Sequence, residues 1–210
     1  ILKEFYDPVI DHLRCNFFAH EVMNKAVGLT SEGEAHELLE SLCLKTLRDN
    51  LSVMAVHTSS NKVAAVCLNG ILRRGDLEKD LEKLNTLSDE KYKLIFGLLI
   101  KFNLSCNIFA REDVNELFEC RVVSVDETFR GKGLGGKLIE VSEEICRKEG
   151  YKVMKADATG IFSQKIFHKR GFEVVFETKY EDIKDENGKQ LMKTEPPHFV
   201  FKTVMKKFDE

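Results

Sequence analysis

The feature that most constrains this chain is a glycine-rich turn between a predicted strand and a predicted helix. The strand is the apolar run LFECRVVSV at residues 117–125, and the turn follows within ETFRGKGLGGKLIE at residues 127–140. Apolar residues then recur at helical spacing over residues 133–148, and Gly150 is a natural stop for that helix. Glycines at such a junction let backbone N–H groups approach an anion, and the N-terminus of the following helix adds a favourable dipole. The turn therefore predicts a phosphate-binding site.

Three phosphate-binding patterns fit this turn. A P-loop needs Ser or Thr after its lysine to hold magnesium, but Leu138 follows Lys137. A dinucleotide-binding G-x-G-x-x-G turn begins as its strand ends, whereas residues 126–130 precede Gly131. Asp157 lies where a ribose-binding acid would fall, but the chain after it is too short for the rest of a dinucleotide domain. The third pattern, the R-x-x-G-x-G of an acyl-CoA pyrophosphate loop, fits throughout. A turn required only for tight packing is the remaining alternative.

Hydrophobic periodicity divides the rest of the chain into short elements. Helices are predicted at 7–16, from a capping box at Ser31 and Glu34 to residue 50, at 76–102 as two helices broken near 88–89, and at 162–169. Strands are predicted as a hairpin between 51 and 72, and at 151–157, 172–180 and 198–207. This order predicts one domain over residues 1–210, with an α/β fold in which helices flank a mixed, mostly antiparallel central sheet.

Composition and charge narrow the class of protein. The 210 residues are 43% hydrophobic and 32% charged, which is typical of a soluble globular protein. The net charge of -3, with acids and bases mixed along the chain, argues against nucleic acid or a membrane surface as a partner. The longest apolar stretch, at 94–100, is far shorter than a membrane span. The six cysteines form no C-x-x-C pair, so we expect free thiols, no metal site and a cytoplasmic location.

The turn and the order of elements together resemble the GNAT superfamily of N-acetyltransferases. KRGFEVV at 169–175 is similar to the segment that follows the last helix in that superfamily. The resemblance covers nearly the whole chain and implies the GNAT acyl-CoA N-acyltransferase fold, with acetyl-CoA as co-substrate and no metal. It also implies that main-chain groups of Val123 and Val125 hold the pantetheine arm. The residues implied for the phosphates are Arg130, Gly131, Lys132, Gly133, Gly135 and Gly136.

A narrower resemblance is to insect-type arylalkylamine N-acetyltransferases. They carry a phrase like F-F-x-x-E-P-x-N after the first helix, and this chain has FFAHEVMN at 17–24. Val22 stands where that family has proline, and His20 where it often has an acid. The phrase implies that Glu21 acts on the amine substrate.

A second phrase of that family, serine-x-x-x-serine, is matched by Thr159 and Ser163. Many GNAT enzymes place a tyrosine four residues before the glycine of a GF pair to protonate the departing thiolate. Phe167 occupies that position here, so another acid is expected. Ser163 is our candidate, and a helix cap is the alternative for a serine in a first helical turn.

Acetyl transfer to a primary amine requires a base, because an amine with a pKa of about 10 is protonated at neutral pH. Glu21 is the candidate base, with a solvated surface acid as the alternative. His198 is expected to be an ordinary strand histidine, although it could instead face the amine pocket. Cys120 and Cys146 have no partnered base in view and are expected to pack in the core, so no acetyl-enzyme is expected.

The sequence therefore predicts a cytoplasmic, monomeric N-acetyltransferase that passes an acetyl group from acetyl-CoA to a small primary amine in a ternary complex. The expected acceptor is an arylalkylamine of the dopamine, serotonin, tyramine or octopamine type. Two alternatives stay open. One is an enzyme for polyamines or other non-aromatic amines, and the other is a non-catalytic acyl-CoA-binding sensor.

Overall fold

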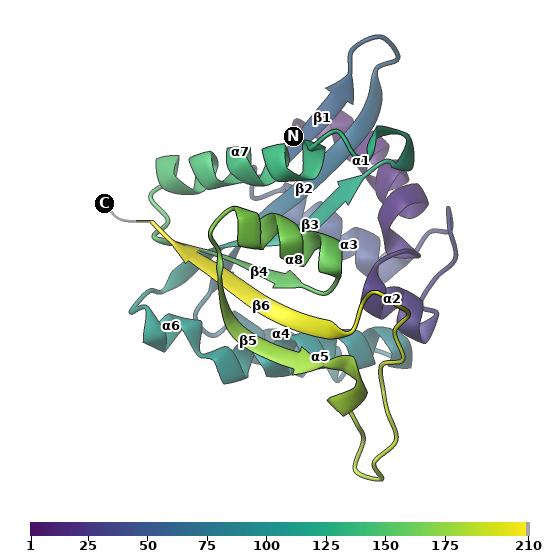
Figure 1. Ribbon diagram of the computed structural model, residues 1–210, viewed down its shortest axis with the longest axis vertical. Helices are drawn as coiled ribbons and strands as arrows, with labels where there is room; N and C mark the ends of the chain where they lie inside the picture. The colour runs from purple at the N-terminus through teal and green to yellow at the C-terminus, as the bar shows by residue number, and fades with distance from the viewer. Residues whose placement is uncertain (209–210) are drawn as a thin grey trace.

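The computed structural model describes residues 1–208, and a six-stranded sheet lies at the centre of the molecule (Figure 1). The strands are β1 (Val53–His57), β2 (Lys62–Arg73), β3 (Glu116–Val125), β4 (Val153–Ala158), β5 (Glu173–Lys179) and β6 (Val200–Lys207). Their order is β1-β2-β3-β4-β6-β5, and all neighbours are antiparallel except β3 and β4, which are parallel. The predicted fold class, a mixed and mostly antiparallel sheet flanked by helices, is confirmed.

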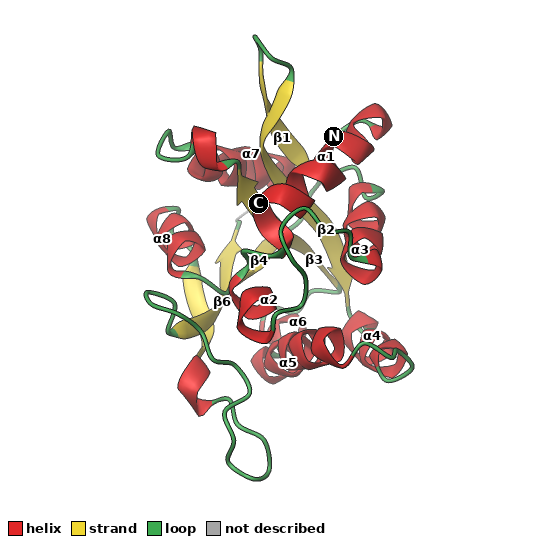
Figure 2. Ribbon diagram, turned by 90° about the vertical axis from the view of Figure 1, so that its right-hand side faces the viewer, coloured by secondary structure: helices red, strands yellow, loops and turns green. Residues whose placement is uncertain are grey.

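Helices cover both faces of this sheet (Figures 1 and 2). On one face lie α7 (Leu134–Lys148) and α8 (Ile161–Lys169). The remaining helices gather toward the other face: α1 (Tyr6–Leu13), its π-helical continuation η2 (Arg14–Phe18), α2 (Val22–Val27), α3 (Glu37–Leu47), α4 (Asp76–Leu84), α5 (Glu90–Cys106) and α6 (Ile108–Arg111). Short 3-10 turns are η1 (Lys3–Phe5), η3 (Glu127–Phe129) and η4 (Tyr180–Asp182).

Alternating side chains along the strands give each face of the sheet its own hydrophobic core. Val66 and Leu68 of β2 are buried in the cluster that contains α1, α3 and α5. The intervening residue, Cys67, is buried in the cluster on the α7 side, together with Met154 of β4. Both faces are therefore covered, and the central strands are buried on both sides.

Helix α7 has the predicted ends. It begins after Gly133, whose φ is +78°, and it ends before Gly150, whose φ is +79°. Both angles are in the left-handed region that favours glycine. Beyond the helix, the Tyr151 N–H donates to the Cys146 carbonyl at 2.9 Å, which closes the last turn. Gly135 has a packing reason as well, because a Cβ there would lie 3.0 Å from the Ile166 side chain of α8.

One prediction about the N-terminal helices was wrong, and one helix there was not predicted. The second helix begins at Glu37, after Ser31 and Glu34, because His36 caps it: Nδ1 of His36 accepts the Leu39 N–H at 3.4 Å. The Ser31 N–H and the Glu34 carboxylate do meet, at 3.3 Å, but they close an isolated turn. The six-residue helix α2 was not predicted, because two helical turns are too short for a periodic pattern.

The helical stretch Glu90–Arg111 is the one run among residues 1–208 that is long and apolar enough to cross a membrane by length and composition. The sequence prediction considered only its apolar centre and missed this. In the fold, Ile95, Ile100 and Phe102 of α5 are buried in the core. The Phe102 ring centroid lies 4.9 Å from that of Phe201 in β6, so α5 is a central helix of this face.

The parallel strands β3 and β4 part after a short contact. Only residues 118–120 of β3 pair with residues 154–156 of β4, whereas β3 continues to Val125 and β4 to Ala158. A bulge in β3 at Arg121 shifts its register against β2 at the same level. The far end of β3 is therefore paired on the β2 side only, and its other edge borders an open space.

Candidate active site

A cleft of about 1680 Å³ opens where β3 and β4 part. Its walls come from α1 and η2, the start of α2, the end of β3, the glycine-rich loop, the first turns of α7 and α8, and the segment before β6. The structure brings most of the predicted site residues to this one cleft: Glu21, Val123, Val125, Arg130, Gly131, Gly133, Gly135, Gly136, Thr159 and Ser163. Lys132 is the exception, since its ammonium group lies 5.1 Å over the Phe129 ring and does not line the cleft. Lys132 thus has no place in the wall.

The glycine-rich loop presents main-chain N–H groups to the cleft. Gly131 and Gly133 both have positive φ, at +77° and +78°, and helix α7 begins directly after them at Leu134. The first N–H groups of a helix have no partner within it, and the helix dipole favours an anion there. At the loop entrance, Nε of Arg130 donates to the Val125 carbonyl at 3.2 Å, which places a guanidinium beside these amides. This arrangement fits a diphosphate.

The free edge of β3 continues the cleft from this loop. The Asp126 N–H donates to the Ala64 carbonyl of β2 at 3.0 Å. Because main-chain groups alternate along an antiparallel strand, those of Val123 and Val125 point the other way, into the gap between β3 and β4. The carbonyl of Val125 confirms this direction by accepting from Arg130. These groups suit an extended ligand that carries amides.

The carboxylate of Glu21 lies at the opposite wall, at the start of α2. One oxygen, Oε2, accepts the Asn24 N–H at 2.8 Å and so caps the helix. The other, Oε1, is buried and has no hydrogen-bond partner among the described residues. A buried carboxylate oxygen without a donor is unfavourable, so it is a ready acceptor for a cationic or N–H group entering the cleft. The sequence placed this residue correctly, just beyond the first helix.

His198 lies in the loop before β6, which begins at Val200, and it lines the cleft. The expectation of an ordinary strand histidine was wrong. Its Nδ1 accepts the Ile161 N–H at the start of α8, at 3.2 Å, so in the neutral ring the proton is on Nε2. A Cβ on Gly160 would lie 3.1 Å from this Nδ1 and from Val22 of α2. Glycine at 160 therefore lets three elements meet at the cleft wall.

Thr159 and Ser163 frame the same wall from the start of α8. The Ser163 hydroxyl donates to the Gly160 carbonyl at 2.9 Å, within the first helical turn. The Thr159 carbonyl accepts from the hydroxyl of Tyr180 at 2.8 Å. Phe167, one turn beyond Ser163, is buried against Phe172 with ring centroids 4.9 Å apart. The hydroxyl groups on this wall thus come from residues 159 and 163, while position 167 belongs to the core.

Tyr180 is a contributor that the sequence did not reveal. It is buried behind the wall, where its hydroxyl holds the turn at Thr159. Burial raises the pKa of Tyr180, and the nearby charges of Glu21 and Asp157 raise it further, so its hydroxyl stays protonated and keeps donating. No sequence motif indicates that a tyrosine after a predicted strand would donate a hydrogen bond to the Thr159 carbonyl.

His12 is a second contributor that the sequence did not reveal, and it holds the floor of the cleft beside the loop. His12 of α1 places Nδ1 at 3.3 Å from the Val63 carbonyl and Nε2 at 3.0 Å from the Ser124 hydroxyl. Burial lowers the pKa of His12, so the ring is neutral and can satisfy both contacts at once. Ser124 lies between Val123 and Val125, and the histidine thereby ties α1 to the free edge of β3.

The residue that follows this strand is also fixed. Asp126 lies 2.7 Å from the Lys62 ammonium group and accepts the Thr128 N–H at 2.9 Å. Burial alone would raise the pKa of Asp126, but the bonds to Lys62 and Thr128 outweigh it and lower the pKa to about 2. These contacts hold the path of the chain into the loop.

Aromatic side chains give the cleft an apolar surface beside His198 and along η2. Phe162 lines the cleft with 66% of its surface exposed, and its ring meets that of His198 edge to face at 5.8 Å. Phe17 contributes from η2. Phe199 is almost equally exposed, at 59%, but it does not line the cleft. An exposed aromatic ring at the mouth of a cleft is a natural contact for an apolar ligand.

The six cysteines are free thiols. As predicted, Cys120 and Cys146 are buried. Burial raises the pKa of Cys146 to about 12, which leaves the thiol protonated and unreactive at neutral pH. Among residues 1–208, no group of three His, Cys, Asp or Glu side chains is arranged to hold a metal ion.

Comparison with known proteins places this cleft in context. Residues 104–172 match the model of the Acetyltransferase (GNAT) family. The chain is similar to the crystal structure of arylalkylamine N-acetyltransferase 2 from Aedes aegypti, with 49% identity, coverage of 100% of this chain and 97% of that chain, and a TM-score of 0.96. A mosquito arylalkylamine N-acetyltransferase like 5b matches at 23% identity, with coverage of 98% and 96% and a TM-score of 0.88. A Drosophila melanogaster polyamine N-acetyltransferase that forms N-acetylagmatine matches at 20% identity, with coverage of 98% and 96% and a TM-score of 0.86. At 23% and 20% identity, the similarities to these last two structures show a shared fold alone.

Proposed function

The chain belongs to the GNAT family of acetyltransferases, and on this premise we propose that it acetylates an arylalkylamine of the dopamine, serotonin, tyramine or octopamine type. As a member of that family it is an acetyl-CoA-dependent acyltransferase. The observation that carries the choice of amine is one cleft that combines the unpartnered Glu21 oxygen with the exposed Phe162 ring. An arylalkylamine has a cationic end and an apolar ring, and this wall offers a partner for each.

We infer that the loop and the free edge of β3 hold acetyl-CoA. Main-chain N–H groups from Gly131 to Gly136 and the Arg130 guanidinium receive the diphosphate. Val123 and Val125 offer main-chain groups to the pantetheine amides. Acetyl-CoA supplies an activated thioester, and the chain supplies the position of that thioester between β3 and β4. Holding both reactants in one cleft converts a bimolecular reaction into an effectively unimolecular one. The effective concentration of one reactant beside the other is then of order 10⁵ M or more.

The proton transfers are assigned to residues on the amine side. Oε1 of Glu21 accepts a proton from the ammonium group, which leaves the amine nitrogen a lone pair to attack the thioester carbonyl carbon. Attack on the carbonyl carbon forms the C–N bond, and the nitrogen then carries one proton more than the amide product. As the C–S bond breaks, the Ser163 hydroxyl donates its proton to the departing sulfur and takes up the proton that the nitrogen releases, so the amide, the free thiol and Ser163 are all left neutral. The Nε2–H of His198 is a further donor on this wall. The acetyl group passes directly to the amine, because no cysteine among residues 1–208 is hydrogen-bonded to a His, Asp or Glu side chain that could activate it as a nucleophile, including the exposed Cys15 in the cleft wall.

The release of free thiol from acetyl-CoA, measured across a panel of amines, tests this proposal. Dopamine, serotonin, tyramine and octopamine are expected to drive turnover with a higher kcat/KM than spermidine, putrescine or agmatine. A higher kcat/KM for the aliphatic amines would instead assign the enzyme to polyamines. Thermal stabilisation by CoA without turnover on any amine would indicate an acyl-CoA-binding sensor.

A pair of aromatic variants tests the role of the exposed ring. Phe162→Ala is expected to lower kcat/KM for tyramine about tenfold, because the aryl ring loses an apolar contact. Its kcat/KM for agmatine is expected to change little. The matched control is Phe199→Ala, which removes a similarly exposed ring outside the cleft and is expected to leave both values unchanged. An equal loss for tyramine and agmatine in Phe162→Ala would contradict the aromatic contact.

A further inference from the structure

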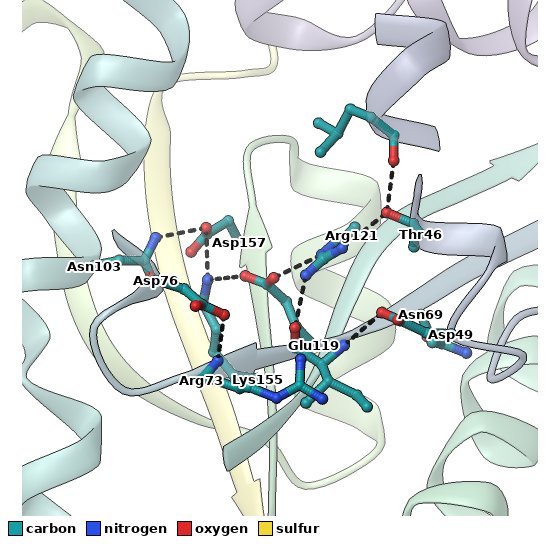
Figure 3. Close-up of polar contacts among 12 residues, drawn as sticks. Thr46, Asp49, Asn69, Arg73, Asp76, Asn103, Glu119, Arg121, Lys155 and Asp157 are labelled. Atoms are coloured by element: carbon teal, nitrogen blue, oxygen red, sulfur yellow. Dashed lines mark hydrogen bonds and ion pairs between the residues drawn. The ribbon is translucent and has the colours of Figure 1, made fainter. Parts of the chain in front are cut away.

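Four charged side chains outside the cleft form a cluster at the level where β3 and β4 part, with Lys155 buried and the other three half-buried (Figure 3). Lys155 of β4 is only 1% exposed, and its ammonium group lies 2.7 Å from the Glu119 carboxylate of β3. The same ammonium group lies 2.9 Å from Asp157, two residues further along β4. Glu119 and Lys155 are register partners, and the next pair, Cys120 with Ala156, is the last before the strands separate. The ion pair therefore lies at the apex of the gap.

The network is closed on the β3 side by Arg121. Its guanidinium donates to Glu119 at 2.8 Å, to the Thr46 hydroxyl of α3 at 2.9 Å and to the Ile71 carbonyl of β2 at 3.0 Å. Arg121 is the bulge residue of β3, so these bonds hold the side chain at the point where the strand changes register. The neighbouring strand leaves room for it, since a Cβ on Gly70 would lie 2.5 Å from Nη1 of Arg121.

The network is closed on the β4 side by Asp157. Its Oδ2 accepts from the Asn103 amide of α5 at 2.8 Å, and its Oδ1 accepts from the Thr203 hydroxyl of β6 at 2.9 Å. Side chains from β3, β4, α3 and α5 thus meet at one cluster (Figure 3), and the Thr203 hydroxyl adds a contact from β6. The cluster carries two positive and two negative charges and is neutral as a whole.

A cluster of charged side chains removed from water is not an effective way to stabilise a fold. Removing four charges from water costs more than their attraction returns unless the geometry is excellent, and apolar side chains of similar size often stabilise a core as well or better. The geometry here keeps Glu119, Arg121 and Lys155 charged. Burial alone would raise the pKa of Glu119, but Lys155 and Arg121 lower it to about 2. The carboxylates of Asp157 and Glu119 likewise keep the pKa of Lys155 above its ordinary value against the effect of burial.

We propose that Lys155 and its partners are positioning residues that fix where β3 and β4 separate, and thereby set the width of the gap that receives acetyl-CoA. The main-chain pairing between these strands ends one rung beyond Glu119 and Lys155, and the ion pair of these two side chains ties the strands together just before they separate. Val123, which begins the free edge, lies two residues beyond Arg121. The proposal rests on the placement of acetyl-CoA given above.

A charge-balanced double variant tests this role. Lys155→Met with Asp157→Asn removes one positive and one negative group, leaves the Glu119–Arg121 pair intact and keeps the side-chain volumes close. We expect cooperative unfolding with a Tm near that of the wild type, and a dissociation constant for CoA that is at least about tenfold higher by calorimetry, since a displaced edge misplaces its donors. The KM for acetyl-CoA is expected to rise in parallel, while the KM for the amine stays within about twofold.

A second variant keeps the test decisive if the double variant does not fold. Thr203→Val removes one hydrogen bond to Asp157 and keeps the shape of the side chain, and it is expected to raise the dissociation constant for CoA about threefold. The control is Lys207→Met with Glu112→Gln, which removes an ion pair of 3.1 Å at the opposite end of β6. This control is expected to bind CoA like the wild type.

A wild-type dissociation constant for CoA in both network variants overturns the proposal, whether or not their Tm falls, because the cluster would then serve stability only. The proposal is also overturned if the control binds CoA as weakly as the two network variants, because the loss of affinity would then not depend on the cluster. Absence of CoA binding by the wild-type protein would instead refute the placement of acetyl-CoA itself.

Discussion

Glu21 combines two roles in one carboxylate. One oxygen caps α2 through the Asn24 N–H, and the other is buried in the wall of the cleft with no hydrogen-bond partner among residues 1–208. The cap fixes the side chain, so the second oxygen keeps its direction when the amine is absent. This is the arrangement expected of a base that is positioned before its substrate arrives.

Glu21→Gln separates these roles. The amide oxygen of glutamine can still accept the Asn24 N–H, so the fold and the Tm are expected to change little. The amide cannot take a proton, and kcat/KM for the amine is expected to fall about 100-fold, with residual turnover from positioning alone. Steady-state kinetics measures both outcomes. Glu34→Gln is the control, because Glu34 also accepts a backbone N–H but is exposed outside the cleft. Full activity in Glu21→Gln would exclude it as the base.

Asp126 makes stability depend on pH. Lys62 and Thr128 lower its pKa to about 2 in the folded state, whereas an unfolded aspartate has a pKa of about 4. A carboxylate with a lowered pKa stabilises the folded state above the unfolded value, and this contribution is lost as the pH falls through the folded value. Asp126→Asn is therefore expected to lower the Tm at pH 7 and to approach the wild type between about pH 4 and pH 2. A difference in Tm that stays constant over this range would contradict the assignment.

At the scale of elements, helix α7 carries a glycine with positive φ at each end, and only one of them is in the cleft. Gly133 lines the cleft at the N-terminus, and Gly150 follows the C-terminus. Alanine at either position is expected to cost about 1 kcal/mol from the left-handed backbone, or roughly 3 °C in Tm. Only Gly133→Ala is expected to weaken CoA binding, about tenfold, because only it displaces phosphate-binding amides. Equal CoA affinities in the two variants would argue against the loop as the diphosphate site.

Elements with a strong local signal were predictable from the sequence. The strand, glycine-rich loop and helix from residue 116 to residue 148 carry period-two and helical patterns with clear stops, and the structure confirms them. Elements defined by tertiary contacts were not. The start of α3 depends on a histidine cap, and α2 is too short to show periodicity. The bulge at Arg121 leaves no mark in the alternation of β3, since its cause lies in Thr46 and Ile71 of other elements.

In the candidate site, too, residues in local motifs were predictable from the sequence, whereas residues that act through tertiary contacts were not. Glu21, Thr159, Ser163 and the loop glycines were found from short motifs, each of which lies on one segment. His12 and Ser124 are 112 positions apart, and their hydrogen bond exists only because α1 packs on the end of β3. The interaction of Tyr180 with Thr159 likewise joins segments that a linear pattern does not connect.

At the scale of the molecule, one feature links these parts. Strands β3 and β4 pair over residues 118–120 and 154–156 and separate beyond them, and the loop, the free edge of β3 and the wall of α2 and α8 all border the separated end (Figures 1 and 2). The buried charge cluster lies at the point of division (Figure 3). The fold thus brings the loop amides, the free edge of β3 and the Glu21 carboxylate into one cleft, in the order in which the proposed diphosphate, pantetheine arm and amine would occupy it.

The most direct test of this account is a crystal structure of the protein grown with CoA. We predict the diphosphate at about 2.7–3.2 Å from main-chain N–H groups between residues 131 and 136, and the pantetheine arm along Val123 and Val125. We also predict the thiol within the gap, facing the wall that carries Glu21 and Ser163. A diphosphate bound elsewhere, with the loop amides occupied by water or by the chain itself, would contradict the central claim.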